Sequence, residues 1–472
     1  MSSARGCLIR LLNVEESDVA GLPLSALAAC ATLGSYYYLQ PLGDTLALTM
    51  GIEFTPLVTV GNMALILCLN PLYAYAARSL PTETILPFMY RIVSFVLLLF
   101  AVLFYLFQSY KPLAFCFSVY VGTISLFTTT TFYARLASLH SKAEAKRVYG
   151  IIAAGAQTGQ LLASLTAPLL FGAMGNTIVI VAACTYEVAV QLVRCRSKVA
   201  DASASSSASS AASAEPTSSK HGAQTSEASR APEPGAPSAD CGDTCVGRAA
   251  TSAFGGFAIL ASTPFLRAIT AHTLLITFLV SGVWYERASA VAAAFATSKE
   301  QYDFFANLNF IVGSCTLLVQ SLCFSHILRY LGFNGTLLAE PLAMGVGLCI
   351  AIVRPGLLSI AFLDGFRKVV HYSLAKPTKE GLYASLPKDV VFIAKPLLDT
   401  LVYRTGSLVG AGYFTMAINY GLTPTMRQYM LLAVVVVWSG NCWWLGLLAE
   451  RHQQAQEVAL NTSGPQGGKA LL

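Results

Sequence analysis

The stretch "ILPFMYRIVSFVLLLFAVLFYLF", residues 85–107, decides the fold class of this chain. It holds a single charged residue, Arg91. As a helix it is long enough to cross the hydrocarbon core of a bilayer, which takes about 20 residues. Similar runs recur along the 472 residues, and the whole chain is 55% hydrophobic and 11% charged. Soluble proteins carry about 25% charged residues. The sequence therefore predicts an all-α, polytopic membrane protein.

The apolar runs predict transmembrane spans in two groups of six. The first group covers residues 22–42, 57–77, 85–107, 113–136, 148–171 and 177–193, and the second covers residues 265–283, 304–323, 334–352, 357–374, 391–418 and 429–448.

A segment rich in Ser, Ala, Pro and Gly separates the two groups. It has too little apolar surface to offset the entropy of ordering, so we expect it to be disordered. The predicted units are an N-terminal six-helix bundle (1–198), a cytosolic linker (199–250), a C-terminal six-helix bundle (251–450) and a flexible cytosolic tail (451–472).

Six spans, a linker and six more spans are the layout of the major facilitator superfamily, whose halves are parallel repeats around a central site. An internal echo supports two repeats. The fifth span begins "RVYGIIAAGAQTG" and the eleventh contains "LVYRTGSLVGAG". Each has two glycines four residues apart, Gly155 with Gly159 and Gly406 with Gly410. Small residues at this spacing let helix backbones approach closely, so these glycines favour helix packing over substrate contact.

Basic residues predict the orientation in the membrane. They gather in the loops after the even-numbered spans, which positive-inside topology assigns to the cytosol together with both termini. The net charge of +6 follows from these loops and does not indicate nucleic-acid binding. No secretory signal peptide is visible, and the resident membrane is left open. The basic loop residues are Arg78, Lys142, Lys146, Arg147, Arg194, Arg196, Lys198, Arg329, Lys376, Lys379 and Lys388.

No motif for catalysis, metal binding or a cofactor is visible. The chain has no Walker A loop, no GxSxG elbow and no pairing of CxxC with HxxxH. Its cysteines are scattered, and the nearest pair in a polar region is Cys241 with Cys245 in the linker. We therefore expect no enzyme, no metal and no cofactor, and we expect any transport to be driven by gradients or exchange.

The tenth span carries the most informative charges. Asp364, Arg367, Lys368 and His371 stand at i, i+3, i+4 and i+7, which places them on one helix face. Charged side chains inside a membrane are costly and usually line a cavity or pair with one another. One interpretation is a binding face for an anionic substrate. The other is internal neutralisation, with Asp364 paired to Arg367 or Lys368. One cation of this face stays unpaired in either case, and the residues alone support both interpretations.

Other ionisable residues are weaker candidates. Arg135 ends the fourth span after a run of threonines and is kept as a candidate for substrate binding. For the rest, an interfacial position or an ion pair is the favoured interpretation. These residues are Asp44, Arg91, Glu187, Glu286 and Arg287.

The stretch "AKPTKEGLYASLPKDVVFIAKPLLDTLVYRTG", residues 375–406, is unusually polar for this chain. Lys379 and Glu380 follow the tenth span, and Lys395 and Asp399 are i, i+4 on the helix that leads into the eleventh. By spacing alone, a salt-bridged cytosolic gate and a binding site fit equally well.

This stretch resembles a pattern of the nucleotide translocase family, the ATP/ADP carriers of plastids and intracellular bacteria. The pattern is P-x-K-E-x-x-Y-x-x-L-x-x-D, followed by a Lys and an Asp four apart. Two further segments are similar to the family and its bacterial relatives: "SKAEAKRVYGIIAAGAQTG" (141–159) and "YYYLQPLGD" (36–44). The matching residues of the first segment are Pro377, Lys379, Glu380, Tyr383, Leu386, Asp389, Lys395 and Asp399.

The resemblance implies a twelve-helix facilitator fold that exchanges nucleotides, usually ATP against ADP. Lys379 matches the motif lysine that the family uses for transport, and Glu380 the acid beside it. Gln40 and Gly43 stand where the bacterial relatives have arginines, and Pro396 interrupts the family's "GKAAID" segment. The loss of two cations weakens the case for a triphosphate.

Three hypotheses follow. The first is a carrier that exchanges ATP with ADP by alternating access, as a monomer, with a nucleotide and the lipid bilayer as its partners. The second is a facilitator of another organic anion or solute. The third is a non-transporting scaffold or receptor, against which the charged face of the tenth span argues. In the first hypothesis phosphates bind Arg135, Arg367, Lys368 and Lys379, and the gating or ion-pair residues are Asp364, Glu380, Lys395 and Asp399.

Overall fold

The computed structural model describes residues 21–107, 110–139, 142–212, 255–383, 390, 394–395 and 397–462, and the regular structure in these ranges is helical. The first half contains α3 (Leu22–Thr49), α4 (Thr55–Ser79), α5 (Thr82–Leu106), α6 (Lys111–Leu139), α7 (Lys142–Met174) and α8 (Val179–Ala212). The second half contains α10 (Gly255–Ser262), α11 (Pro264–Ala294), α12 (Ser298–Leu318), α13 (Phe324–Val353), α14 (Leu357–Val370), α15 (Lys376–Tyr383), α17 (Tyr403–Asn419) and α18 (Pro424–Thr462).

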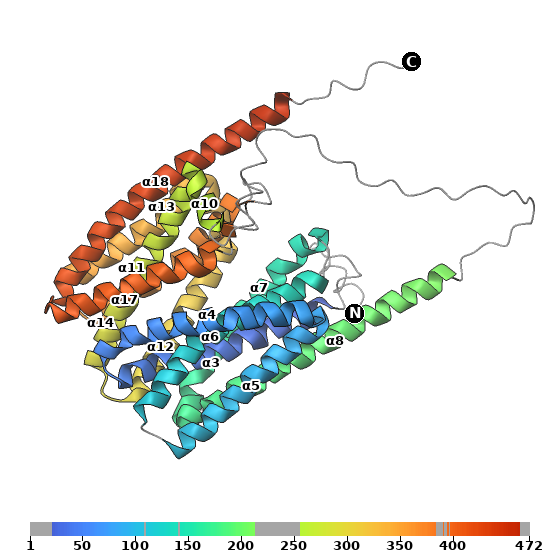
Figure 1. The fold of residues 1–472 in the computed structure, drawn as a ribbon, viewed down its shortest axis with the longest axis horizontal. Helices are drawn as coiled ribbons and strands as arrows, with labels where there is room; N and C mark the ends of the chain where they lie inside the picture. Colours follow the sequence, from blue (N-terminus) through green and yellow to red (C-terminus); the bar gives the residue numbers. More distant parts are fainter. Residues whose placement is uncertain are drawn as a thin grey trace, which may run out of the picture.

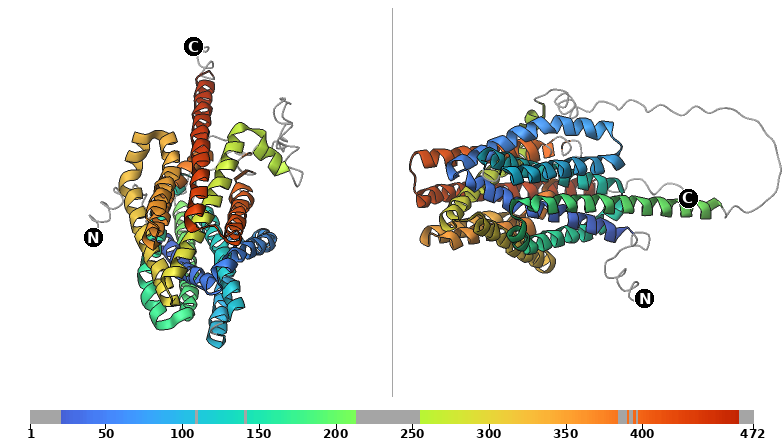
Figure 2. Two further views of the ribbon diagram at one scale, coloured as in Figure 1. Left: turned by 90° about the vertical axis from the view of Figure 1, so that its left-hand side faces the viewer. Right: turned by 90° about the horizontal axis from the view of Figure 1, so that it is seen from below.

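The predicted spans fall on these helices, with part of the eleventh outside the described residues. By length and composition, eight helical stretches of the described chain are apolar enough to cross a membrane. Figures 1 and 2 show the long helices of both halves running in roughly one common direction. Large apolar side chains cover the outside of the bundle, for example Leu169 (77% exposed) and Leu358 (84% exposed). Such a surface suits lipid and would be costly in water.

Each half has its own apolar core. One core is built mainly from α3 and α5–α8, with Leu39, Phe117 and Tyr186 fully buried, and it takes in Tyr302 and Ala306 of α12. The other is built largely from α11, α13, α14 and α18, with Leu279 and Trp438 fully buried.

The predicted glycine pairs pack helices together. A Cβ on Gly155 or Gly159 of α7 would collide with backbone carbonyls of α3, those of Ala26 and Cys30. The first and fifth spans of the N-terminal half are therefore in backbone contact.

In the second half, a Cβ on Gly406 of α17 would collide with Thr277 of α11. A Cβ on Gly410 would lie 2.7 Å from Cβ of Ser281, also on α11. The seventh and eleventh spans thus pack as the first and fifth do. The packing interpretation is confirmed, and it supports two repeats.

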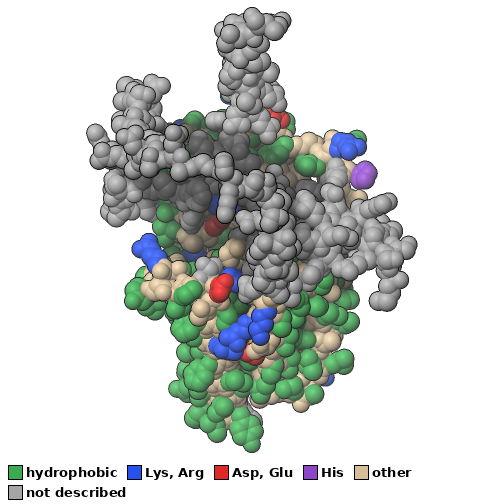
Figure 3. Space-filling view, turned by 90° about the vertical axis from the view of Figure 1, so that its right-hand side faces the viewer, with side chains coloured by type: hydrophobic (Ala, Val, Ile, Leu, Met, Phe, Trp, Pro, Cys, Tyr) green, Lys and Arg blue, Asp and Glu red, His purple; other side chains and the backbone are tan. Residues whose placement is uncertain are grey.

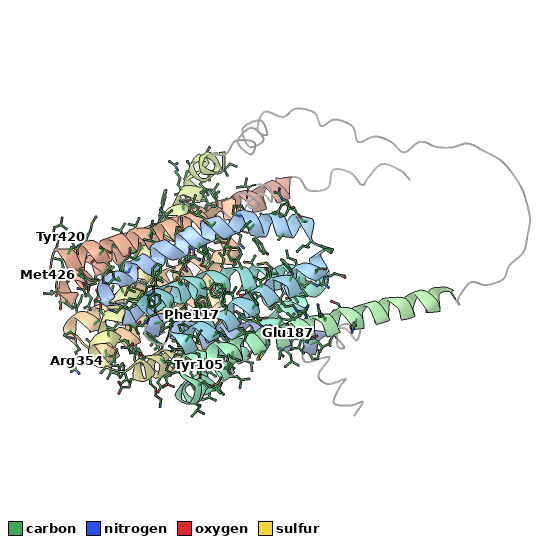
Figure 4. The ribbon with its side chains drawn as sticks, turned by 60° about the horizontal axis from the view of Figure 1, so that its bottom comes forward. Tyr105, Phe117, Glu187, Arg354, Tyr420 and Met426 are labelled. Carbon is green, nitrogen blue, oxygen red and sulfur yellow. The ribbon has the colours of Figure 1, made fainter. Side chains whose placement is uncertain are left out.

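The two ends of the bundle differ. Helix α3 begins, and α8 and α18 end, at one end, which we call the linker end (Figure 1). Arg354, Tyr420 and Met426 mark the opposite end, which we call the far end (Figure 4). Having both chain ends of each half on one side agrees with an even number of spans. Which end faces the cytosol stays a prediction.

The helices continue past two predicted boundaries. Helix α8 runs to Ala212, so the predicted linker start at residue 199 lies inside it. Residues 199–212 are mostly Ala and Ser, and alanine is the best helix former. Helix α18 likewise continues to Thr462, beyond the predicted start of the tail at 451. The rest of the linker and tail, with Cys241 and Cys245, lies outside the described residues, and the domain division stays a prediction.

The tenth span is also longer than expected. A π-helical turn, His371–Ala375, joins α14 directly to α15, so Lys379 and Glu380 lie on a helix and not in a loop. Pro377 cannot donate a backbone hydrogen bond, and a wide turn just before it accommodates this loss. Burial of Leu382 and Tyr383 holds the last turn against the core.

Candidate functional site

A cavity of about 270 Å³ lies between the two halves. Its walls come from α3, α4 and α6 of the first half and from α11 and α17 of the second. Most of its lining is polar or aromatic and uncharged. The lining residues include Tyr36, Gln40, Gly43, Asp44, Asn62, Trp284, Tyr285 and Arg404.

Arg404 is the cation among the described residues that line the cavity. It is the second residue of α17, and its Nη1 donates a 2.9 Å hydrogen bond to Oδ1 of Asn62 on α4. The bond links the two halves, and its acceptor is neutral. The cavity wall therefore holds the guanidinium of Arg404 and the carboxylate of Asp44 together with aromatic rings such as those of Tyr36 and Trp284.

Contacts between the halves lie in the wall of this cavity and around it. The hydroxyl groups of Thr59 and Tyr285 lie 2.7 Å apart. The Tyr302 hydroxyl donates to the carbonyl oxygen of Tyr38 over 3.1 Å. Leu48 of α3 packs against residues of α11 and α12 in a small apolar cluster. These contacts join the two halves beside the cavity.

A buried arginine connects the cavity wall to the charged face of the tenth span. Arg287, at the end of "VWYER" in α11, is 2% exposed. Its Nη2 lies 3.1 Å from Oδ2 of Asp44, and its Nη1 lies 2.7 Å from Oδ2 of Asp364. One guanidinium therefore bridges a carboxylate of each half, which a planar fork of donors does well.

The same face holds further ion pairs. Asp364 also lies 3.1 Å from Arg367 and 2.8 Å from Lys368. Glu340 of α13, only 1% exposed, lies 3.9 Å from Arg367 and 2.9 Å from Nδ1 of His371. We call these residues the ion network: Asp44, Arg287, Glu340, Asp364, Arg367, Lys368 and His371.

The charges of the ion network balance when His371 is neutral, because three cations face three acids. Buried charges are tolerated when they are paired in this way. The expectation that one cation of the tenth span stays unpaired was wrong, since Arg287, Asp44 and Glu340 complete the balance. The neutralisation interpretation gains support, and substrate binding by Arg367 and Lys368 stays a prediction.

The polar stretch after the tenth span also forms ion pairs. Nζ of Lys395 lies 2.6 Å from Glu380, and Nζ of Lys379 lies 3.9 Å from Asp399. These pairs connect α15 to the segment that leads into α17, so both lie within the second half. Their carboxylates are about half exposed. Figure 3, which looks onto the linker end, shows Lys, Arg, Asp and Glu side chains near its middle. Lys388, Asp389 and Pro396 lie outside the described residues.

Arg135 lies apart from the other candidates. It is about 20 Å further along α6 than Gly122 of the cavity wall, at a rise of about 1.5 Å per residue. Its guanidinium donates to Ser197 of α8 at 2.8 Å and lies 3.9 Å from Glu83 of α5. These contacts tie Arg135 to α5 and α8, away from the cavity.

The weaker candidates do form ion pairs. Glu286 pairs with Arg427 of α18, with 3.2 Å between Oε2 and Nη2. Arg91 pairs with Glu187 at 3.2 Å near the bundle surface. With Asp44 and Arg287 already described, the ion-pair interpretation of all five residues is confirmed.

Sequence reasoning missed two residues of this region. Glu340 is an acid inside the apolar ninth span, and that position alone was a signal for a buried partner. Arg404 was noted only as part of a polar stretch. Its approach to the cavity depends on contact with Asn62, 342 positions away in the sequence. Among the described residues, no group of three or more His, Cys, Asp or Glu is arranged to hold a metal ion.

Comparisons with known proteins identify the fold of this chain but not its family. No model of a known protein family matches the sequence, and no curated protein matches it. Solved structures do match over nearly the whole chain.

One match is a bacterial homolog of the human lysosomal transporter Spinster in an inward-facing, unoccupied conformation. It is 13% identical, covers 93% of this chain and 98% of its own, and has a TM-score of 0.56. A point mutant of the nucleoside transporter NupG is 10% identical over 92% and 99% of the two chains, with a TM-score of 0.53. A bacterial homologue of the iron transporter ferroportin, inward-facing, is 12% identical over 90% and 98%, with a TM-score of 0.56.

These likenesses define the class of the protein: a polytopic helical membrane protein. More particularly, its helices have the major facilitator fold of these solved structures. At such low identity the likeness shows the fold alone.

Proposed function

We propose that this protein is a secondary transporter that moves a small organic anion through the central cavity by alternating access. The observation that carries the proposal is Arg404, a cation on the cavity wall whose described hydrogen-bond partner is the neutral Asn62. A substrate anion would replace a neutral amide oxygen with a charged one, which strengthens the interaction. Because Asn62 belongs to the other half, substrate binding would also alter a contact between the halves.

The cavity favours a ring-bearing anion of modest size. Carboxylate and phosphate groups match the guanidinium fork. Tyr36 and Trp284 offer ring faces and edges for stacking. A volume of about 270 Å³ is near the lower end of ligand pockets, which span roughly 300–1,000 Å³. An aromatic carboxylate or a nucleoside monophosphate fits these features.

Exchange of ATP with ADP is the second candidate function. The pairs Lys395–Glu380 and Lys379–Asp399 favour it, because they join residues that match the nucleotide translocase pattern. The cavity argues for a lower substrate charge. Gln40 and Gly43 both line it, and these are the two positions where the bacterial relatives have arginines. A triphosphate would therefore meet only Arg404 on the described cavity wall.

Uptake into liposomes tests both candidates. The full-length protein is reconstituted, the vesicles are loaded with an unlabelled compound, and entry of the labelled compound is followed. The probes are nicotinate, AMP, ADP and ATP. We expect saturable uptake of nicotinate or AMP, a loss of at least tenfold in Arg404→Gln, and normal uptake in the control Arg91→Gln. Equal uptake by Arg404→Gln and the unaltered protein would overturn the role of Arg404. ATP uptake driven by internal ADP, lost in Lys379→Gln, would establish the second candidate instead.

A further inference from the structure

His371 has one ring nitrogen engaged and one available for a proton. Its Nδ1 lies 2.9 Å from Oε1 of Glu340. An ionised carboxylate only accepts hydrogen bonds, so Nδ1 carries the hydrogen and Nε2 is the basic atom of the neutral ring. Within the described part of the chain nothing hydrogen-bonds to Nε2. The side chain of His371 is 27% exposed, whereas that of Glu340 is 1% exposed.

Charged and titratable groups face His371 from several helices. Glu340 faces it from α13, and Arg367 of α14 contacts the same carboxylate. Lys379 of α15 and His272 of α11 interact electrostatically with this site. Nδ1 of His272 carries no hydrogen, because it accepts a 3.1 Å hydrogen bond from Nε1 of Trp438, which can only donate. The ring of Tyr372 lies 5.0 Å away.

The charge balance of the ion network indicates what a proton on His371 would change. In the second half, Arg287, Arg367 and Lys368 face Asp364 and Glu340, which leaves one positive charge. Asp44 of the first half, on the cavity wall, matches that charge. A proton on His371 raises the surplus of the second half to two, so one positive charge is left without an acid. In a medium of low dielectric such a surplus attracts an anion strongly.

We propose that His371 is a proton-binding site that couples proton uptake to binding of the anionic substrate in the cavity. A continuous series of ion pairs connects the proposed proton site to the cavity wall. It runs from His371 to Glu340, Arg367, Asp364, Arg287 and finally Asp44.

The proposal rests on the proposed function and adds the co-transported ion. Arg404 matches the first negative charge of the substrate, and the protonated His371 matches a second. Because linkage is reciprocal, the anion tightens proton binding as much as the proton tightens anion binding.

The substitution that tests the site is His371→Gln. Glutamine can still donate a hydrogen bond to Glu340 but cannot take up a proton at neutral pH. The matched control is His326→Gln, which alters an exposed histidine of the same half on α13. Full-length protein is placed in liposomes that contain a pH-sensitive dye, and AMP and nicotinate are added in turn.

With the unaltered protein and the control, AMP entry acidifies the lumen, and an inward proton gradient raises AMP uptake about fivefold or more, the lower range of typical couplings. Nicotinate, with one negative charge, responds less. In His371→Gln the gradient has no effect on uptake, while uptake without a gradient remains. Equal stimulation of AMP uptake in His371→Gln overturns the proposal and leaves the proposed function standing.

A second measurement needs no substrate and separates failure of the coupling from failure of transport. A proton on His371 strengthens the attraction of the second half for Asp44, so acid should favour the conformation in which Asp44 and Arg287 are paired. Spin labels at the linker end of each half report the distance between the halves at pH 5.5 and pH 8. We expect a shift in population in the unaltered protein and in His326→Gln, and none in His371→Gln. The same shift in all three proteins contradicts the proposal, even if no probe is transported.

Discussion

Arg287 and Asp44 form an ion pair that joins the two halves of the molecule, with 3.1 Å between Nη2 and Oδ2. The arginine is 2% exposed and the aspartate side chain 15% exposed. The remaining Nη of Arg287 holds Asp364 of its own half at 2.7 Å. The contact between the halves is therefore continuous with the charged face of the tenth span.

Removal of Arg287 should destabilise the protein strongly. In Arg287→Gln, Asp44 loses its described ion-pair partner, and breaking one side of a buried pair typically costs about 3–5 kcal/mol. Thermal and denaturant unfolding in detergent would measure the change. The control is Arg91→Gln, which breaks an ion pair that is about half exposed, and such pairs contribute about 0–1 kcal/mol. If both variants lost the same small amount, the ion network would not contribute to stability as described.

Asp44→Asn should loosen the contact between the halves with a smaller effect on stability. Arg287 keeps Asp364, so it is not left unpaired. We expect the distance between spin labels on the two halves to broaden or shift toward a second conformation, with folding intact. A distribution identical to that of the unaltered protein would show that the Asp44–Arg287 contact does not bias the conformation.

Gly159 should not tolerate a side chain. Gly159→Val would drive Cβ into the carbonyl oxygen of Cys30 and separate α3 from α7, so we expect poor expression of folded protein by size-exclusion chromatography. At Gly150 of the same helix, an added Cβ would have no neighbour within 4 Å among the described residues. Gly150→Ala should be neutral or stabilising by up to about 1 kcal/mol, because alanine is the better helix former. Two well-folded variants would contradict the close packing.

The ion pairs after the tenth span should contribute little to stability. Lys395 and Glu380 are 35% and 50% exposed, so Lys395→Gln should change the free energy of unfolding by less than about 1 kcal/mol. A loss of transport in this variant, recovered by the charge exchange Lys395→Glu with Glu380→Lys, would assign the pair to the transport cycle. Normal transport in Lys395→Gln would remove it from the mechanism.

Gln40→Arg should shift the cavity toward more highly charged anions. Gln40 lines the cavity and accepts a 3.3 Å hydrogen bond from Asn309. An arginine here restores one cation of the pattern seen in the bacterial relatives. We expect ADP to compete with labelled AMP about tenfold better. Gln191→Arg, on the exposed surface of α8, serves as the control. Unchanged competition in Gln40→Arg would mean that residue 40 does not face the substrate.

The spans and their packing glycines could be predicted from the sequence because both depend on local patterns. An apolar run such as residues 85–107 needs a helix in a membrane wherever it lies, and a glycine pair marks close packing without naming the partner. The extent of the tenth span could not be predicted. Lys379 and Pro377 are typical of a loop, whereas burial of Leu382 and Tyr383 keeps the segment helical.

The partners of the charged residues were only partly predictable. The i, i+3 and i+4 spacing placed Arg367 and Lys368 beside Asp364, and the structure has both pairs. The other contacts of the network, Asp44 to Arg287 and Glu340 to His371, join different helices. A single sequence carries no signal for such pairs, so the charge balance that decides between pairing and substrate binding appears only in the folded protein.

Uptake of labelled AMP by liposomes that contain the full-length protein tests the central claim most directly, with Arg404→Gln and Arg91→Gln measured side by side. The account predicts saturable uptake above that of empty liposomes, reduced at least tenfold in Arg404→Gln and unchanged in Arg91→Gln. Uptake that is equal in all three proteins, or no uptake of AMP or nicotinate by correctly folded protein, would contradict it.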